Sequence, residues 1–200
     1  YFTKALEVSC NTFFYRVGYD YWRRLGSDVA DVNAKDPLVA EAKRFGFGKE
    51  TGVDLPGEAS GRIADRRWKR AYFEAQQDYY CKEAAKPTPA GGETFAHLFA
   101  VEFCAEGYAY RAGDAVNFAI GQGDTVVTPL QLARAYGALA NGGTLYEPRI
   151  GKAVVDPNGE VLTTIEPEVQ ARIKVSKKIL RYIDGALQGV TRQGTMAWRM

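Results

Sequence analysis

Residues 117–143 read NFAIGQGDTVVTPLQLARAYGALANGG and give the clearest structural signal in the chain. Gly121 and Gly123, one residue apart, predict a tight turn, because glycine accepts positive φ and lets the backbone approach a neighbour or ligand closely. Thr128 followed by Pro129 is the pattern of a helix N-cap and first helical position. The Asn-Gly-Gly sequence at the end of the stretch should stop this helix. The stretch therefore predicts a turn that leads into a capped helix.

Working outward, the rest of the chain predicts a helix-rich α/β protein with one small β-hairpin. Apolar residues recur at helical steps, and the hairpin surrounds an Asp-Pro-Asn-Gly turn. The expected helices cover residues 11–25, 37–45, 66–85, 128–140 and 176–189, and the expected strands cover residues 150–155 and 160–165. Residues 46–64 should form an ordered loop, and residues 86–92 (KPTPAGG) should break the helical pattern. Residues 95–110 are apolar and aromatic without a clear period and stay unassigned.

The composition is that of an ordinary globular protein, with 200 residues, 46% of them hydrophobic and 25% charged. Lys and Arg number 26 and Asp and Glu number 24, so the net charge is only +2 and does not favour a nucleic-acid partner. No apolar run approaches the roughly 18 residues of a membrane span, and no leader pattern is visible. Neither end resembles a natural terminus, so we expect an internal piece of a longer chain.

Cysteine, histidine and a charge run offer further candidate sites. Cys10, Cys81 and Cys104 lack the paired spacing of a zinc site. Cys81 and Cys104 flank a loop and could form a disulfide outside the cytoplasm; three free thiols are the alternative, and the sequence leaves both open. His97, the only histidine, has no acidic partner at a recognisable spacing, so we interpret it as a surface or packing residue. Residues 65–70 (DRRWKR) are interpreted as the solvated face of a helix, with lipid or protein contact left open.

Ser9 and Asn11 lie two residues apart at the start of the first long helix. A hydroxyl both donates and accepts a hydrogen bond, so it can pass a proton, and a carboxamide can hold a carbonyl and an N–H at once. The alternative is that Ser9 or Asn11 simply caps the helix, which Gly26 would end. On spacing alone, capping is the commoner role for such residues.

Three ordered segments together are more specific than any one of them. VSCNTFFY at 8–15, FGFGKETGVDLPGEASG at 45–61 and NFAIGQGDTVVTPLQLARAYGALANGGTLYEP at 117–148 resemble the transpeptidase domain of class B penicillin-binding proteins. Within that family the chain looks most like the elongation-type enzymes, penicillin-binding protein 2, in an actinobacterial-looking version. The resemblance covers residues 1–200, with an insertion at about 66–110 as its least typical part. It implies the central part of one transpeptidase domain of the β-lactamase-like fold, mostly its helical part plus the small hairpin.

The resemblance also implies which residues carry the chemistry. The family uses three motifs, S-x-x-K, S-x-N and K-T-G. The Ser-Cys-Asn sequence at 9–11 matches S-x-N, whereas neither other motif occurs, and we interpret this as truncation at both ends. By resemblance, Ser9 should relay a proton among the nucleophilic serine, its lysine and the leaving amine, and Asn11 should bind the substrate's amide. Gln122, flanked by Gly121 and Gly123, should line the substrate-binding cleft.

The parent protein would then be a peptidoglycan D,D-transpeptidase that cross-links stem peptides through a serine acyl-enzyme and is acylated by β-lactams. The alternative is a non-catalytic β-lactam sensor or interaction module on the same fold. The parent should be anchored in the cell membrane, with its catalytic part on the extracytoplasmic face and elongation-machinery membrane proteins as partners. Some relatives have a zinc ligand at the position of Cys10, but the upstream ligands are absent from this sequence, so we expect no metal and no cofactor.

Overall fold

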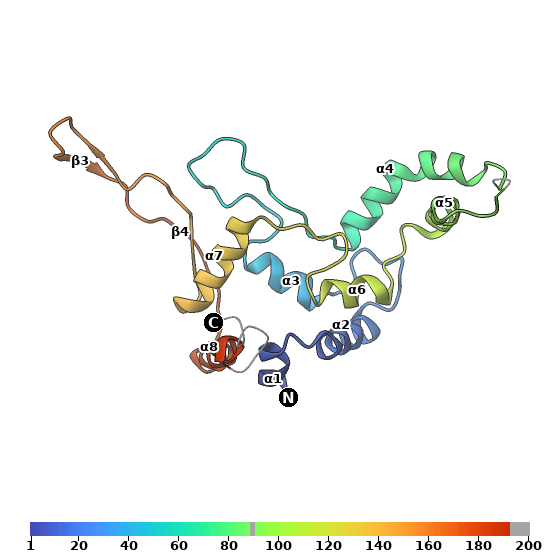
Figure 1. Ribbon diagram of the computed structural model, residues 1–200, viewed down its shortest axis with the longest axis horizontal. Coiled ribbons are helices and arrows are strands. Elements are labelled where there is room, and N and C mark those ends of the chain that lie inside the picture. Colours follow the sequence, from blue (N-terminus) through green and yellow to red (C-terminus); the bar gives the residue numbers. More distant parts are fainter. Residues whose placement is uncertain (89–90, 193–200) are drawn as a thin grey trace. The chain divides into compact units, whose positions relative to one another are not determined.

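The computed structural model describes residues 1–88 and 91–192 (Figure 1). The helices in this part are α1 (Phe2–Glu7), α2 (Asn11–Leu25), α3 (Pro37–Arg44), α4 (Arg66–Ala84), α5 (Phe95–Glu106), α6 (Ala112–Phe118), α7 (Pro129–Ala140) and α8 (Lys177–Arg192). The strands are β1 (Thr144–Tyr146), β2 (Ala153–Val155), β3 (Val161–Thr164) and β4 (Val169–Arg172). The chain divides into two compact units, each described by itself below. Unit 1 comprises Tyr1–Phe14, Val39–Ile63 and Asp124–Met200, and unit 2 comprises Tyr15–Leu38 and Ala64–Gly123.

Local sequence signals account for most of these elements. Thr128 and Gln131 form a capping box at the start of α7, in which each side chain accepts a hydrogen bond from the other residue's backbone N–H, at 3.1 and 2.9 Å. Asp36 precedes α3, and its carboxylate accepts a hydrogen bond from the Leu38 N–H at 3.1 Å. The helices predicted at 11–25, 37–45, 66–85 and 128–140 are confirmed to within one residue at each end. Thr128 is the N-cap of α7, as its sequence predicts.

The predicted hairpin is also confirmed, since β2 and β3 pair antiparallel on either side of the Asp-Pro-Asn-Gly turn. The expectation of a single β element is wrong, however, because β1 and β4 form a second antiparallel pair. These two strands are separated by 22 residues, between Tyr146 and Val169, so no local turn signal could reveal their pairing. The last predicted helix also runs three residues further, to Arg192.

The segment left unassigned from the sequence folds as α5, and α6 follows it. α5 is apolar on most of its circumference, so it carries no amphipathic period that the sequence could show. In the predicted break at 86–92, residues 89 and 90 lie outside the described residues, as do the chain's last residues, 193–200. α4 ends at Ala84 before this segment and α5 begins at Phe95 after it.

Unit 1 has a small apolar core where α7 packs against the β1–β4 pair. Ala138, Leu145 and Ile173 are almost completely buried there. Partly buried side chains from the end of α3, from β4 and from the segment after it pack around them: Phe45, Ala171 and Val175. The backbone N–H of Ile173 donates to the carbonyl of Gly143 at 2.7 Å, which ties the end of β4 to the turn after α7.

In unit 2, α4 and α5 lie side by side (Figure 1). Phe73 of α4 and Phe103 of α5 are both buried, with ring centroids 5.6 Å apart. A disulfide between Cys81 and Cys104 joins the same two helices, which decides the question that the sequence left open. Only Cys10 remains a free thiol among the three. The insertion-like segment is therefore a covalently closed helical hairpin.

The charge run at 65–70 is not the solvated face that we expected. Arg66 is 5% exposed, and its guanidinium donates to the backbone carbonyls of Gly26, Asp28 and Asp31. Lys69 forms an ion pair with Asp114 at 2.6 Å. The prediction failed because helical spacing does not reveal carbonyl groups that come from a distant loop. The run is a structural device that binds α4 to the loop after α2.

Candidate active site

The first predicted motif is held in unit 1 by the packing of α1 against α8 (Figure 1). The Phe2 ring stacks on Tyr182 at a centroid distance of 5.9 Å, and the Thr3 hydroxyl donates to the Tyr182 hydroxyl at 2.7 Å. Gly189 allows close approach on the same side, because a Cβ there would lie 2.6 Å from a carboxylate oxygen of Glu7. These contacts fix the helix whose C-terminal end carries the motif.

Ser9 lies in the turn that ends α1. Its N–H donates to the Leu6 carbonyl at 3.2 Å, and the N–H of Cys10 donates to the Ala5 carbonyl at 2.8 Å. This pair of bonds is a Schellman motif, which requires a left-handed residue at the position of Ser9. Ser9 has φ 51°, and it is the sole non-glycine residue with positive φ in the described part of the chain. The turn directs the backbone out of α1 and into α2.

The interpretation of Ser9 or Asn11 as the N-cap of α2 is wrong. Asn11 is the first residue within the helix, and the carbonyl of Cys10 accepts hydrogen bonds from the N–H groups of Phe13 and Phe14 at 3.2 and 3.5 Å. Cys10 therefore occupies the N-cap position. The two polar side chains are free of the capping role that the sequence suggested for them.

Ser9 and Asn11 are both exposed, whereas Cys10 between them is half-buried. Within the described residues, neither polar side chain makes a hydrogen bond to the protein. Phe13, one turn further on, packs edge-on against Phe2 with a centroid distance of 6.0 Å, which anchors the start of α2. A hydroxyl and a carboxamide thus stand open to solvent at one rigid helix junction, where each can exchange hydrogen bonds with a ligand.

The second predicted motif is a turn in unit 2 with the same backbone pattern. The N–H of Gly121 donates to the Phe118 carbonyl at 3.0 Å, and the N–H of Gln122 donates to the Asn117 carbonyl at 2.9 Å. Gly121 has φ 70° and Gly123 has φ 82°, a left-handed conformation that glycine adopts without steric cost. Gln122 is exposed. Because this turn belongs to the other unit, its place in one cleft with Ser9 and Asn11 stays a prediction.

Sequence reasoning missed three polar residues that shape the loop at 46–64: two buried ones, Gln131 and Arg134, and the half-buried Glu58. Gln131 is 1% exposed, and its amide nitrogen donates to the carbonyls of Lys49 and Ser60 at 2.7 and 2.8 Å. Arg134 donates to the carbonyl of Thr51 at 3.0 Å. Burial lowers the pKa of Arg134, and the nearby carboxylates oppose this shift. Gln131 and Arg134 lie three residues apart on α7, so their helical spacing was the available signal.

The third missed residue, Glu58, closes this loop on itself. Its carboxylate accepts hydrogen bonds from the Thr51 hydroxyl at 2.6 Å and from the N–H groups of Thr51 and Gly52 at 2.8 and 2.9 Å. Burial raises the pKa of Glu58, but these hydrogen bonds outweigh it, and the pKa lies below its ordinary value of 4.5. Glu58 therefore stabilises the loop as a carboxylate.

Metal-ligating residues do not gather in the part of the chain that the structure describes: no group of three or more His, Cys, Asp or Glu side chains is found there. The expectations of no metal and no cofactor stay predictions. His97 is half-buried in the first turn of α5. None of the described helices combines the length and apolarity needed to cross a membrane.

Comparison with known proteins supports the family resemblance. The family model of the penicillin binding protein transpeptidase domain matches residues 1–199. The chain is 29% identical over 173 residues to the peptidoglycan D,D-transpeptidase MrdA of Salmonella typhimurium, which covers 82% of this chain and 20% of the relative. It is 26% identical over 205 residues to penicillin-binding protein 2A of Bacillus subtilis, which covers 98% and 22%. The chain thus spans about a fifth of the length of these curated relatives.

Solved structures give the fold. The chain matches the penicillin-binding protein PBP2 of Helicobacter pylori, in its complex with MreC, with a TM-score of 0.59 and 23% identity. The match covers 96% of this chain and 26% of that one. A second match, to PBP2 of Pseudomonas aeruginosa in complex with WCK 5153, has a TM-score of 0.57. The predicted helix-rich fragment of the transpeptidase fold is therefore confirmed.

Proposed function

We propose a function from the premise that this chain belongs to the penicillin-binding protein transpeptidase family, as the match over residues 1–199 shows. The chain supplies the central part of a peptidoglycan D,D-transpeptidase of the penicillin-binding protein 2 type. The intact protein cross-links stem peptides through a serine acyl-enzyme and is acylated by β-lactams. The observation that carries the proposal is the exposed Ser9 hydroxyl, presented by a left-handed turn in the matched S-x-N sequence.

Three exposed polar side chains have roles that their placement supports. The Ser9 hydroxyl relays a proton between the acylated serine's lysine and the leaving amine, because a hydroxyl both donates and accepts. The Asn11 carboxamide binds the amide of the stem peptide or of the β-lactam side chain. Gln122, held between Gly121 and Gly123, contributes a further carboxamide to the substrate cleft. The serine nucleophile and the lysine belong to motifs that are absent from these 200 residues.

The disulfide between Cys81 and Cys104 supports a location outside the cytoplasm, since stable disulfides form in oxidising compartments. With the family resemblance, this leads us to propose that the parent protein is a membrane-anchored enzyme whose catalytic part faces the cell wall. Its partners are membrane proteins of the elongation machinery, consistent with the solved complex of a PBP2 with MreC. Roles in cell-wall synthesis and cell shape belong to the same proposal.

The test uses the full-length protein that contains this chain and a fluorescent penicillin. Ser9→Ala should slow acylation by about 10²–10⁴-fold, because a positioned proton relay contributes this much. The variant keeps the backbone and the fold, so its unfolding midpoint should match that of the wild type. Thr163→Ala removes an exposed hydroxyl from β3 and serves as the matched control, with an unchanged acylation rate.

Acylation of Ser9→Ala at the wild-type rate would contradict the proposed relay. A transpeptidation assay with a stem-peptide donor and an acceptor amine separates the enzyme from the sensor. An intact protein that is acylated by penicillin yet never transfers the acyl group to the amine would identify the β-lactam sensor instead. Asn11→Ala should weaken acylation by both penicillin and stem peptide, since each presents an amide to the carboxamide.

A further inference from the structure

A cavity of about 440 Å³ opens between the C-terminal half of α4 and the beginning of α5, within unit 2. Its volume lies in the range of about 300–1,000 Å³ that is typical of ligand pockets. Its lining shares no residue with either predicted catalytic motif. The disulfide between Cys81 and Cys104 holds its two helices together, so the cavity has a covalently fixed frame.

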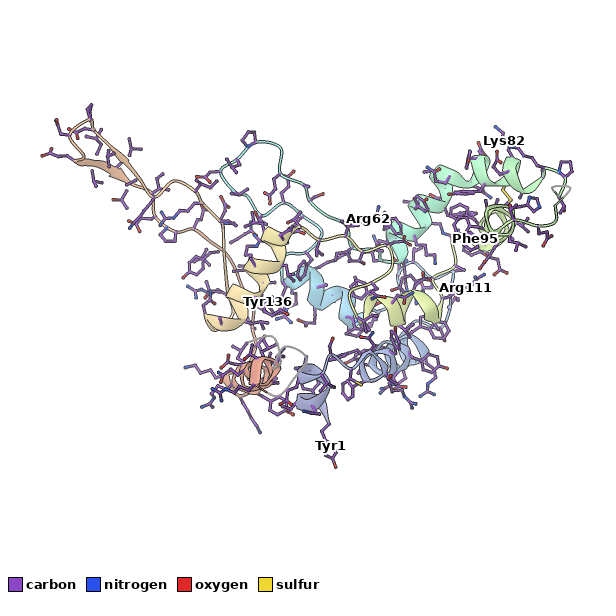
Figure 2. All side chains as sticks on the ribbon, in the orientation of Figure 1. Tyr1, Arg62, Lys82, Phe95, Arg111 and Tyr136 are labelled. Carbon is purple, nitrogen blue, oxygen red and sulfur yellow. A yellow bond between two sulfur atoms is a disulfide. The ribbon has the colours of Figure 1, made fainter. Side chains whose placement is uncertain are left out.

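Aromatic rings form the apolar wall of this cavity. Tyr79, Tyr80, Phe95 and Phe99 line it, with centroid distances of 5.1 Å between the tyrosines, 5.4 Å between Tyr80 and Phe99, and 6.3 Å between the phenylalanines. Phe95, labelled in Figure 2, is 84% exposed, and Tyr79 is 58% exposed. Among the lining residues that the structure describes there is no Leu, Ile, Val or Met. Aromatic side chains, rather than flexible aliphatic ones, thus form the exposed apolar wall.

Polar groups of both signs complete the lining. Glu83 and Lys86 form an ion pair at 2.5 Å on the α4 side. The Glu83 side chain is 35% exposed and the Lys86 side chain is 62% exposed. Thr94 and His97 line the α5 side. A carboxylate, an ammonium group and an imidazole therefore converge on a space walled by aromatic rings. An apolar protein segment would have to remove this ion pair from water, which is costly.

We propose that this cavity is a saccharide-binding site. One face of a pyranose ring presents C–H groups, which are attracted to the negative face of an aromatic ring. The hydroxyl and acetamido groups at its edge can exchange hydrogen bonds with Glu83, Lys86 and His97. Only the identity of the natural ligand, the N-acetylhexosamine glycan of peptidoglycan, rests on the proposed function. The site would hold a glycan strand.

The test is an NMR titration of the full-length protein that contains this chain with chitotetraose, a soluble N-acetylhexosamine tetramer. We expect saturable shifts of the His97 imidazole and of aromatic signals. Phe95→Leu keeps an apolar side chain but loses the ring face, so it should raise the dissociation constant about threefold to tenfold. Phe95→Trp keeps a ring face and should bind at least as tightly as the wild type. Because Phe95 is so exposed, neither change should disturb folding.

Tyr136→Ala is the matched control, since this α7 tyrosine in unit 1 is 52% exposed and should not affect binding. The absence of saturable shifts, or equal affinity of Phe95→Leu and wild type, would overturn the saccharide site. So would tight binding of an amphipathic Leu/Lys peptide to both proteins without any response to chitotetraose. Penicillin acylation of the full-length Phe95→Leu protein should be normal. Wild-type acylation of Ser9→Ala would contradict the proposed relay and would leave the saccharide site standing.

Discussion

The two units each carry one predicted motif on the same kind of turn, but with a different residue at its critical position. In unit 2, Gly121 takes the left-handed conformation at φ 70°, which costs glycine nothing. In unit 1, Ser9 takes it at φ 51°, which costs an L-residue with a side chain about 1 kcal/mol. Since glycine would build the turn of unit 1 better, backbone geometry does not account for the serine, which fits the role proposed for its hydroxyl. Strain kept at an exposed polar residue is a reason to assign it a function.

The units also differ in what holds them together. Unit 2 has the Cys81–Cys104 disulfide, whereas unit 1 relies on a small apolar core and on polar side chains that bind the loop at 46–64. Reduction of the disulfide should therefore lower the free energy of unfolding of unit 2. The free energy of unfolding of unit 1 should instead depend on pH. Four substitutions can test these differences in the turns and in what stabilises each unit.

The largest effect is expected from the disulfide. Replacing both Cys81 and Cys104 by Ala should lower the free energy of unfolding of unit 2 by about 3 kcal/mol, because the bridge closes a loop of 23 residues in the unfolded chain. Urea unfolding followed by near-UV circular dichroism would measure it. Cys10→Ala removes a free thiol and is the control. An unchanged urea midpoint in the double variant would show that the disulfide does not stabilise unit 2.

Gly121→Val should lower the free energy of unfolding by about 2 kcal/mol, because a β-branched residue is strained at positive φ. The strain would be purely conformational, since a Cβ at this position meets nothing within 4 Å. Gly121→Asn, which tolerates the left-handed region, should be close to the wild type. Chemical denaturation of the three proteins checks the order, and a neutral valine variant would refute the left-handed turn.

Ser9→Gly should have the opposite effect. It should raise the free energy of unfolding by about 1 kcal/mol, because it relieves the backbone strain of a left-handed serine at φ 51°. Ser9→Ala keeps the strain and should stay within about 0.5 kcal/mol of the wild type. Thermal and urea unfolding of these variants isolate the backbone effect from the loss of the hydroxyl. If Ser9→Gly is less stable than the wild type, the hydroxyl is structural and the functional interpretation fails.

The smallest effect concerns the pH dependence of unit 1. The folded pKa of Glu58 lies below its ordinary value of 4.5, so its carboxylate stabilises the fold above that pH and loses this contribution as the pH falls through the lowered pKa. Between about pH 6 and about pH 3, the wild type should lose more stability than Glu58→Gln. Parallel acid titration curves for the two proteins would show that Glu58 does not hold the loop.

Helix α7 and the β2–β3 hairpin illustrate what could be predicted. The Thr128–Pro129 cap and the Asp-Pro-Asn-Gly turn act over a few residues, so their effect is readable in sequence order. α5 could not be predicted, because its nearly uniform apolarity acquires an orientation only when Phe103 packs against α4. Arg66 looked solvated for the same reason, since the carbonyls that bind it come from residues 26–31.

The candidate site divides in the same way. Ser9, Asn11 and Gln122 were selected from their motifs; all three are exposed, and their roles stay predictions. Gln131, Arg134 and Glu58 were missed because each one acts on backbone groups of a loop that is remote or folded back upon itself.

By itself, the sequence determined the helices with local caps, the hairpin with its own turn, and the family to which its three ordered motifs point. These features depend on interactions between residues close along the chain, or on the residue types within a motif, and the amino-acid sequence shows both directly. Tertiary structure alone decided that the two cysteines pair, that Arg66 is buried, and that Ser9 ends one helix rather than capping the next. Each of those outcomes depends on the positions of backbone groups or side chains in three dimensions, which local propensity does not encode.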